Sequence, residues 1–212
     1  MIRKLLKPLL KYKKFRQVSR NAVLKGTRYV FEDGAYVALI DGSKKEDIIL
    51  GNNIILKGRL ASQHGGKISI GDNVGIWPHS SVQSVNSVTI GNNCRISSNT
   101  IITDNNNHPT HPLFTQYRAS HIEDTDACLW KHAQSAPVKI GNNCWIGQNV
   151  RIQKGVTIGD NCIIAANSVV TKNVPDNCIA AGNPAKIVKT DIDKLPLPTT
   201  SEKFNEWVKT RQ

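Results

Sequence analysis

A six-residue spacing of aliphatic side chains is the feature of this 212-residue sequence that most restricts its fold. The first run is Ile70, Ile76 and Val82, followed by Ile90, Ile96 and Ile102, with two extra residues around Val85–Asn86 between its halves. The second run is unbroken: Ile140, Ile146, Ile152, Ile158, Ile164 and Val170. A period of six matches neither a strand, with its period of two, nor a helix, with its period of 3.6. It predicts short strands joined by tight turns, with one inward aliphatic residue per strand.

The residues between these positions suit the turns. Gly141, Gly147 and Gly159 directly follow inward residues, where a backbone corner favours glycine. Pairs of Asn and Asp recur as well, and they tolerate left-handed turn conformations: Asn52–Asn53, Asp72–Asn73, Asn92–Asn93, Asn142–Asn143 and Asp160–Asn161. Three strands would make one triangular coil of 18 residues, and stacked coils would bury a continuous aliphatic ladder. The predicted fold class is therefore all-β, a solenoid of parallel strands.

The period breaks between residues 103 and 137. This segment is polar and aromatic and contains four of the six histidines, at positions 108, 111, 121 and 132. We expect a long structureless loop that protrudes from the solenoid, and such excursions usually carry function.

The repeat divides the chain into three parts. Residues 1–45 form a basic arm and lead-in, residues 46–190 form the solenoid with its loop at 103–137, and residues 191–212 form a tail with a short terminal helix. Leu50 and Leu56 indicate a turn upstream of the first run, and Pro175 begins an irregular exit.

The basic arm accounts for much of the formal net charge of +12, because its first 28 residues include Lys and Arg but no Asp or Glu. It could pack on the solenoid as a partly helical arm, or lie on an anionic membrane surface through its leucines and cations. Nucleic acid is disfavoured, because few aromatic residues interleave the cations.

No apolar run approaches the roughly 20 residues of a membrane span, and lysines interrupt any signal-peptide core. We expect a cytoplasmic protein with five reduced cysteines, in peripheral contact with the inner membrane surface if the arm binds lipid. Cys94, Cys144 and Cys162 each stand two residues before an inward aliphatic residue, which predicts a packing role for them.

Three motifs in the second half of the chain are specific in combination. They are the I-G-x-N-x-W-I-G step at 140–147, the V-T-K-x-V-P exit at 170–175 and the A-G-x-P-A-K close at 181–186. With them, residues 68–190 resemble the hexapeptide-repeat acetyltransferases, and in particular the galactoside and maltose O-acetyltransferases and the capsule and lipopolysaccharide O-acetyltransferases.

This resemblance implies a left-handed parallel β-helix that assembles as a homotrimer, with acetyl-CoA as co-substrate in the groove between neighbouring subunits. It implies that His108, which Pro109 follows, is the catalytic base, with His111 as the nearby rival. The cofactor-binding positions carried over by the resemblance are Trp145, Gln148, Ala166, Thr171, Lys172, Lys186 and Lys189. No metal ligand is implied.

The acceptor is the point of departure from that family. The positions where galactoside acetyltransferases bind the sugar fall here near Trp77 and Val85, which cannot make the same hydrogen bonds. The basic arm also replaces the usual N-terminal cap. The chemistry therefore transfers better than the acceptor does, and the arm and the family together favour a cell-surface polysaccharide or its precursor.

Acetyl transfer to a hydroxyl needs a base and a site for the developing oxyanion. A neutral imidazole can accept the hydroxyl proton near neutral pH. Backbone N–H groups at the coil corners could stabilise the oxyanion. We expect direct transfer in a ternary complex, with a covalent intermediate on Cys128 as the less favoured alternative.

Three other functions compete with this interpretation. One is N-acetylation of a nucleotide-linked amino sugar, which is disfavoured because no Gly-rich nucleotide-sugar segment precedes the solenoid. Another is a zinc solenoid like the γ-class carbonic anhydrases, with His108 and His111 joined by His79 or His64. A non-catalytic scaffold is the last.

Overall fold

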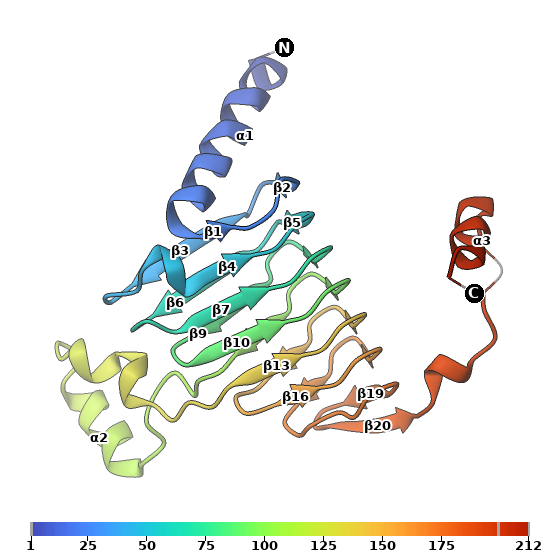
Figure 1. The fold of residues 1–212 in the computed structure, drawn as a ribbon. Helices are drawn as coiled ribbons and strands as arrows, with labels where there is room; N and C mark the ends of the chain where they lie inside the picture. Colours follow the sequence, from blue (N-terminus) through green and yellow to red (C-terminus); the bar gives the residue numbers. More distant parts are fainter. Residues whose placement is uncertain (1, 199, 212) are drawn as a thin grey trace.

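The computed structural model describes residues 2–198 and 200–211, with side chains from residue 8 onward in those ranges. The chain winds into a three-sided stack of short parallel strands, from which one loop and both terminal helices project (Figure 1). The observed architecture is the parallel β-helix that the repeat predicts, and it is consistent with the left-handed winding that the family resemblance implies.

Each side of the stack is one sheet. The first sheet, A, consists of β1 (Val23–Leu24), β4 (Ile48–Leu50), β7 (Lys67–Ile70), β10 (Ser87–Ile90), β13 (Val138–Ile140) and β16 (Thr157–Ile158). The second, B, consists of β2 (Tyr29–Phe31), β5 (Ile54–Leu56), β8 (Gly75–Ile76), β11 (Arg95–Ile96), β14 (Trp145–Ile146), β17 (Ile163–Ile164), β19 (Ile179–Gly182) and β20 (Ala185–Lys189). The third, C, consists of β3 (Tyr36–Ile40), β6 (Arg59–Gln63), β9 (Ser81–Ser84), β12 (Ile101–Thr103), β15 (Arg151–Ile152) and β18 (Val169–Val170).

The core is a set of three aliphatic ladders, one per sheet. In sheet A, for example, Ile70, Ile90, Ile140 and Ile158 follow one another in register, and each is at most 2 % exposed. The residues with six-residue spacing are thus the ones that point inward, as predicted. Burying a side chain of this size contributes about 1.5–3 kcal/mol relative to leaving it exposed, so the ladders dominate the stability of the stack.

The corner between sheets A and B is held by stacked asparagines. Asn93, Asn143 and Asn161 all have a left-handed backbone, with φ of 57°, 57° and 55°. Each amide donates to the next along the stack, from Asn93 to Asn143 and from Asn143 to Asn161, at 3.0 Å. The spacing between such partners is 20 residues from Asn73 to Asn93, 18 from Asn143 to Asn161 and 16 from Asn161 to Asn177, so the early coils are longer than expected and the last one is shorter.

The stack begins earlier in the chain than the sequence indicated. Strands β1, β2 and β3 form a first coil upstream of residue 46, in register with β4, β5 and β6. Helix α1 (Ile2–Asn21) then packs its last turns on this coil. Val18 is fully buried, and the Gln17 side chain forms two hydrogen bonds with the Val37 backbone, at 2.6 and 3.2 Å. The helical, packed form of the arm is therefore the observed one.

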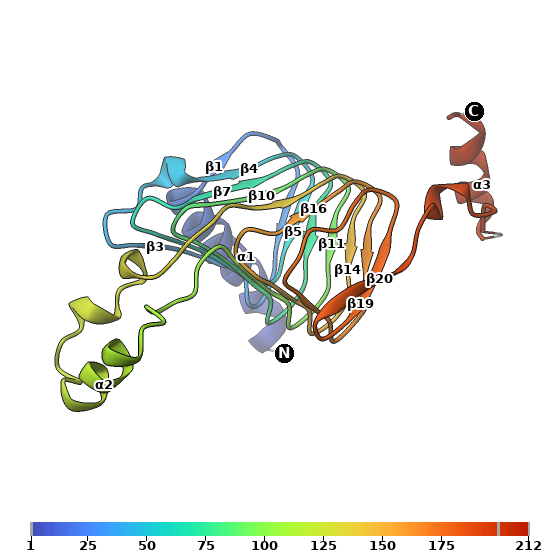
Figure 2. The same ribbon diagram turned by 90° about the horizontal axis from the view of Figure 1, so that it is seen from below.

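Two further expectations need correction. The excursion at 103–137 is not structureless, because it contains α2 (Pro112–Ser120) and two short 3-10 helices, η2 (Asp126–Cys128) and η3 (Trp130–His132). The exit after residue 175 is also ordered, since β19 and β20 continue sheet B as an antiparallel pair. Beyond it, η4 (Ile192–Lys194) and α3 (Glu202–Lys209) lie away from the stack, as Figure 2 shows. A 3-10 turn, η1 (Lys45–Asp47), precedes β4.

Candidate active site

The base of the protruding loop is fixed by a buried carboxylate. Asp104 is fully buried and accepts hydrogen bonds from the Ser84 hydroxyl at 2.7 Å, from Val85 N at 3.0 Å and from Asn86 N at 2.9 Å. Val85 and Asn86 are the two extra residues of the repeat at this corner, and Asp104 binds the backbone N–H groups of both. A carboxylate with three donors is well satisfied, and it fastens the first turn of the loop to the coil before it.

The two ends of the loop are also joined to each other. Ala136 N donates to Asp104 O at 2.9 Å, and Asn106 N donates to Gln134 O at 3.0 Å. The buried Asn105 side chain donates to Trp130 O at 3.1 Å. His108 follows two residues beyond this closed base, so its position is set by the stack rather than by a free loop.

The two candidate histidines have different surroundings. His108 is exposed, and its ring lies 6.5 Å from that of Phe114 in a stacked arrangement. His111 is the N-cap of α2, and its Nδ1 accepts a hydrogen bond from Leu113 N at 3.2 Å. Because that nitrogen has a structural partner, His111 is the weaker candidate for a base.

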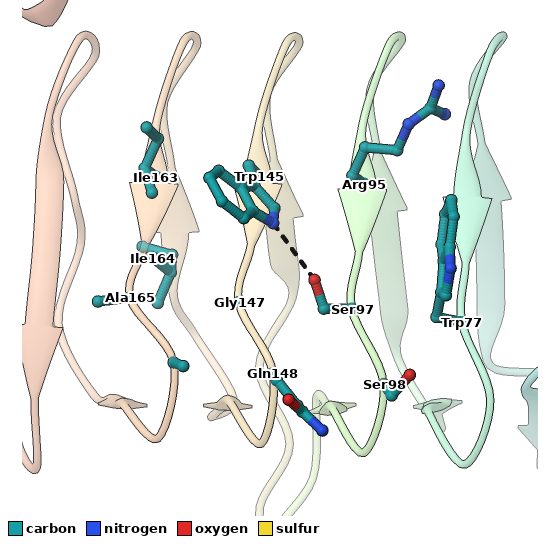
Figure 3. A pocket seen from close by; sticks show the side chains of 11 residues that line it. Trp77, Arg95, Ser97, Ser98, Trp145, Gly147, Gln148, Ile163, Ile164 and Ala165 are labelled. Carbon is teal, nitrogen blue, oxygen red and sulfur yellow. Dashed lines mark hydrogen bonds between the residues drawn. The ribbon is translucent and has the colours of Figure 1, made fainter.

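A groove of about 620 Å³ runs along sheet B and the turns that lead into sheet C (Figure 3). It is lined by Trp77, Arg95, Ser97, Ser98, Trp145, Gly147, Gln148, Ile163, Ile164, Ala165 and Ala166. Trp145 is 55 % exposed, and its indole N–H donates to the Ser97 hydroxyl at 3.3 Å. Three of the sequence-predicted cofactor positions, Trp145, Gln148 and Ala166, thus meet in one groove.

The other four cofactor positions lie at the C-terminal end of the stack. Thr171 and Lys172 follow β18, the last strand of sheet C, and Lys186 and Lys189 lie on β20, the last strand of sheet B. All four are exposed, and none lines the groove. Thr171 and Lys172 lie where the chain leaves sheet C, whereas Lys186 and Lys189 lie on sheet B, so the three lysines make this end of the stack cationic.

Sequence reasoning missed Arg95 and Ser97. Arg95 belongs to the outward row of sheet B, where it pairs with Gly75 on one side and Trp145 on the other. From β8 to β17, each outward position of sheet B directly precedes an inward isoleucine, so this part of the row could have been read from the repeat. What the repeat does not contain is which outward positions face a groove.

Within one chain, His108 and the groove are apart. The loop leaves after β12 in sheet C and returns at β13 in sheet A, whereas the groove follows the corner between sheets B and C. Figure 2 shows α2 and β14 on opposite sides of the stack.

The cysteines belong mainly to the core. Cys94, Cys144, Cys162 and Cys178 are at most 2 % exposed, whereas Cys128 in the loop is partly exposed. The Cys162 thiol is the largest influence on the pKa of Cys144 and lowers it, but the Cys94 thiol and burial outweigh it and raise that pKa to about 12. Buried thiols of this kind are inert.

Two features of the described residues concern metal and membrane binding. Among residues 2–198 and 200–211, no three His, Cys, Asp or Glu side chains gather in a way that could hold a metal ion. In the same part of the chain, no helix is both long and apolar enough to cross a membrane.

Comparisons with known proteins agree with this architecture. Residues 137–172 match the family "Bacterial transferase hexapeptide (six repeats)", and residues 67–104 match "Hexapeptide repeat of succinyl-transferase". The sequence is 32 % identical to galactoside O-acetyltransferase of Escherichia coli (strain K12) over 157 residues, which are 71 % of this chain and 70 % of that protein.

Two solved structures are similar in fold. The polySia specific acetyltransferase NeuO superposes with a TM-score of 0.61 at 27 % identity, covering 88 % of this chain and 79 % of that one. AntD, an N-acyltransferase from Bacillus cereus solved with dTDP and 3-hydroxybutyryl-CoA, gives a TM-score of 0.64 at 19 % identity over 94 % and 96 % of the two chains. The chain belongs to the hexapeptide-repeat acetyltransferases.

Proposed function

We propose that this protein is an acetyl-CoA-dependent O-acetyltransferase that acetylates a sugar hydroxyl of a cell-surface polysaccharide or its precursor, with His108 as general base. The observation that carries the proposal is the pairing of a groove containing Trp145, Gln148 and Ala166 with a histidine on a firmly anchored loop. Two similar proteins have an acceptor in their names, a galactoside in one case and polySia in the other, which supports a sugar acceptor.

The reaction needs only groups that the chain provides. The acceptor hydroxyl gives its proton to the neutral His108 imidazole as its oxygen attacks the thioester carbonyl carbon. The C–S bond then breaks, and the imidazolium returns the proton to the CoA thiolate, so that no charge or atom is left over. General base catalysis of this type is worth about 10²–10⁴-fold in rate.

Acetyl-CoA would lie along the groove, with its phosphates toward Lys172, Lys186 and Lys189. Phosphates need cationic partners, and these three exposed lysines lie at one end of the stack. The acyl end would then lie near Trp145. The acetyl group must meet His108 from another chain, because a single chain holds the loop and the groove at different corners.

A homotrimer follows as part of the proposal, since each loop could reach the groove of its neighbour in a closed ring. Subunit mixing tests it directly. His108→Ala lacks the base, and Ala166→Trp fills the groove, so each homo-oligomer should be inactive. Mixed oligomers should regain activity, because some interfaces combine an intact loop with an intact groove. Mixtures that stay inactive would contradict a site shared between subunits.

The reaction itself is tested by release of free CoA thiol with a panel of sugars, glycolipid precursors, capsule oligosaccharides and a dTDP-linked amino sugar. His108→Ala should reduce acceptor-dependent release by about 10²–10⁴-fold. His111→Asn is the matched control, because asparagine still caps a helix. Its activity should stay near wild type. Release with the amino sugar alone would replace O-acetylation by N-acetylation, and no CoA binding would exclude both.

Peripheral membrane contact by α1 is a separate part of the proposal. Leu9, Leu10 and Tyr12 are 49 %, 50 % and 60 % exposed, and Lys11 and Lys13 are exposed beside them. The side chains of Leu5 and Leu6, two other leucines of the basic arm, lie outside the described residues. Each basic residue near an anionic surface contributes about 1 kcal/mol.

Vesicle co-sedimentation tests this contact. The wild type should bind vesicles of 30 % phosphatidylglycerol more strongly than pure phosphatidylcholine, and Lys11→Glu/Lys13→Glu should lose the difference. The control is Lys139→Glu, which changes an exposed lysine of β13 in sheet A, far along the sequence from α1. Lys57 is not used because it forms a salt bridge with Glu32. Equal binding to both vesicles would rule out an electrostatic membrane contact.

A further inference from the structure

At the N-terminal end of the groove, a glycine lets a tryptophan ring lie against the backbone of the stack. Gly75 occupies the outward row of sheet B, in register with Ile55 and Arg95. A Cβ atom at Gly75 would lie 2.0 Å from Cζ3 of Trp77, so the indole rests directly on the backbone of β8. Figure 3 shows this ring edge-on at one end of the groove, with Arg95 beside it. Glycine at this position is what allows the ring to lie there.

The Arg95 guanidinium lies over the Trp77 ring. Its Cζ lies 5.8 Å from the centroid of the Trp77 ring, and its Nη1 donates to Asn73 O at 3.3 Å. A guanidinium has five N–H donors, so this bond uses one of them. Among the side chains that the structure describes, no carboxylate forms a salt bridge with Arg95.

The position of this pair decides which substrate it would meet. Of the described residues that line the groove, Arg95 alone is charged. It lies on the N-terminal side of Trp145, whereas Lys186 and Lys189 lie at the C-terminal end. If the CoA phosphates are held by those lysines, the Trp77–Arg95 end is left for the acceptor.

We infer that this end of the groove is an acceptor subsite for a sugar that carries a carboxylate, such as a uronic or nonulosonic acid residue. The inference rests on the proposed function and adds a substrate class to it. The guanidinium fork matches the two oxygens of a carboxylate, and the indole face packs against the apolar C–H face of a sugar ring. One guanidinium balances one carboxylate charge.

A neutral sugar would gain less at this subsite. A neutral sugar would cover the indole and remove water from the guanidinium, but it would offer the guanidinium no carboxylate. A polar group that loses water without gaining a partner costs free energy. Hydrogen bonds to charged groups are worth enough to change an affinity by about 10- to 100-fold. The discrimination is therefore measurable with small sugars.

Binding without chemistry is the first test. Affinities of the CoA-loaded protein for methyl glucuronide, methyl sialoside and neutral methyl glucoside are measured by NMR titration. In the wild type, at least one charged sugar should bind 10-fold or more tightly than the neutral one. Arg95→Gln should abolish that preference, and Arg95→Lys should retain part of it. Arg59→Gln, an exposed arginine of sheet C outside the groove, should behave as wild type.

Each result decides the matter. Equal affinities for charged and neutral sugars overturn the inference, and so does the absence of binding by both. So does a preference that survives in Arg95→Gln, or a 10-fold loss of acetyl-CoA affinity in that variant, because Arg95 would then belong to the CoA site. Failure of the proposed function looks different: the charged preference would remain, but no sugar would be acetylated. Acetylation of neutral sugars alone would keep the function and remove this subsite.

Discussion

The buried carboxylate of Asp104 accepts a 2.7 Å hydrogen bond from the Ser84 hydroxyl, and this bond joins the first turn of the loop at 103–137 to the coil before it. The same carboxylate binds two backbone N–H groups of that coil. The rigid stack thus holds the segment that carries His108. Anchoring of this kind is what a general base needs, because a displacement of about 1 Å can cost 10²-fold in rate.

Replacing Asp104 should therefore affect the site more than the fold. Asp104→Asn keeps the size of the side chain but turns an amide toward an N–H donor. We expect a loss of about 1–3 kcal/mol in unfolding free energy, which is the cost of an unsatisfied buried group. Acetyl transfer should fall at least 10-fold while acetyl-CoA affinity stays unchanged, as measured by urea unfolding, thiol release and calorimetry.

Asp126→Asn is the control for this variant. Asp126 lies in the same loop but is exposed, and it pairs with Lys131 and His132 at the surface. Exposed pairs contribute little to stability, so this change should leave both the fold and the rate near wild type. If both variants reduced activity equally, the buried anchor would not be the determinant.

The repeat made the core predictable from the sequence. A solenoid interior admits one aliphatic side chain per strand, and the resulting period of six is visible without a structure. The first coil was missed because its strands carry residues such as Tyr29, Tyr36 and Val37 without the six-residue ladder or the glycines that follow it. Its register comes from contact with β4, β5 and β6, which a local pattern does not contain.

The site was predictable only in part. Family motifs led to Trp145, Gln148 and Ala166, which line one groove. They did not lead to Arg95, because an exposed arginine that faces a groove and one that faces water have the same local sequence signature. Nor could the spacing of the repeat show that His108 and the groove lie at different corners. That fact depends on how three sides close, and hence on tertiary geometry.

The thiols provide a test of burial. Interaction with Cys144 and then burial raise the pKa of the Cys162 thiol, and the pKa of Cys144 is raised to about 12. Thiolate is the reactive form, so these two thiols should resist iodoacetamide at pH 8. Cys94 and Cys178 are at most 2 % exposed, and their burial should keep the reagent from them. Mass spectrometry should find one label per native chain, on the partly exposed Cys128, and five after unfolding in urea. Labelling of Cys144 in the native protein would contradict the packed ladder.

Cys128→Ser distinguishes direct transfer of the acetyl group from transfer through a covalent intermediate on Cys128, when the rate of acetylation is measured. Direct transfer to the acceptor does not use a thiol of the protein, so the variant should acetylate at the wild-type rate. A loss of more than 10²-fold, with acetyl-enzyme absent from the variant but trapped in the wild type, would instead indicate a covalent intermediate on Cys128.

Acid stability should depend on Asp47, a buried carboxylate near the N-terminal end that binds Lys67. Burial, the largest influence, raises the pKa of Asp47, but hydrogen bonds from Lys67 and the Lys44 backbone and the charges of both lysines together lower it below its usual range. A lowered folded-state pKa stabilises the native protein above the unfolded-state value, near 3.8. The stabilisation is lost as the pH falls through the folded-state pKa.

Asp47→Asn should accordingly destabilise the protein at pH 7 and have a smaller effect at pH 2.5. Urea unfolding at the two pH values measures the difference. The exposed Asp193 of η4 is a suitable comparison, and Asp193→Asn should leave the free energy of unfolding at pH 7 near that of the wild type. An equal destabilisation by Asp47→Asn at both pH values would mean that its charge is not the stabilising feature.

The stacked asparagines at the corner between sheets A and B allow a test that distinguishes the effect of backbone strain from that of side-chain hydrogen bonds. Asn143 has φ of 57° and is bonded at 3.0 Å to both Asn93 and Asn161. Asn143→Ala loses both bonds and replaces a residue that tolerates the left-handed conformation with one that does not, at a cost of about 1–2 kcal/mol for the conformation alone. Asn143→Gly loses the same bonds without that strain. We expect losses in unfolding free energy of about 2–3 and about 1 kcal/mol, respectively, since exposed hydrogen bonds contribute at the low end of their range. Equal losses would show that the bonds between asparagines, rather than their tolerance of left-handed turns, explain their recurrence at this corner.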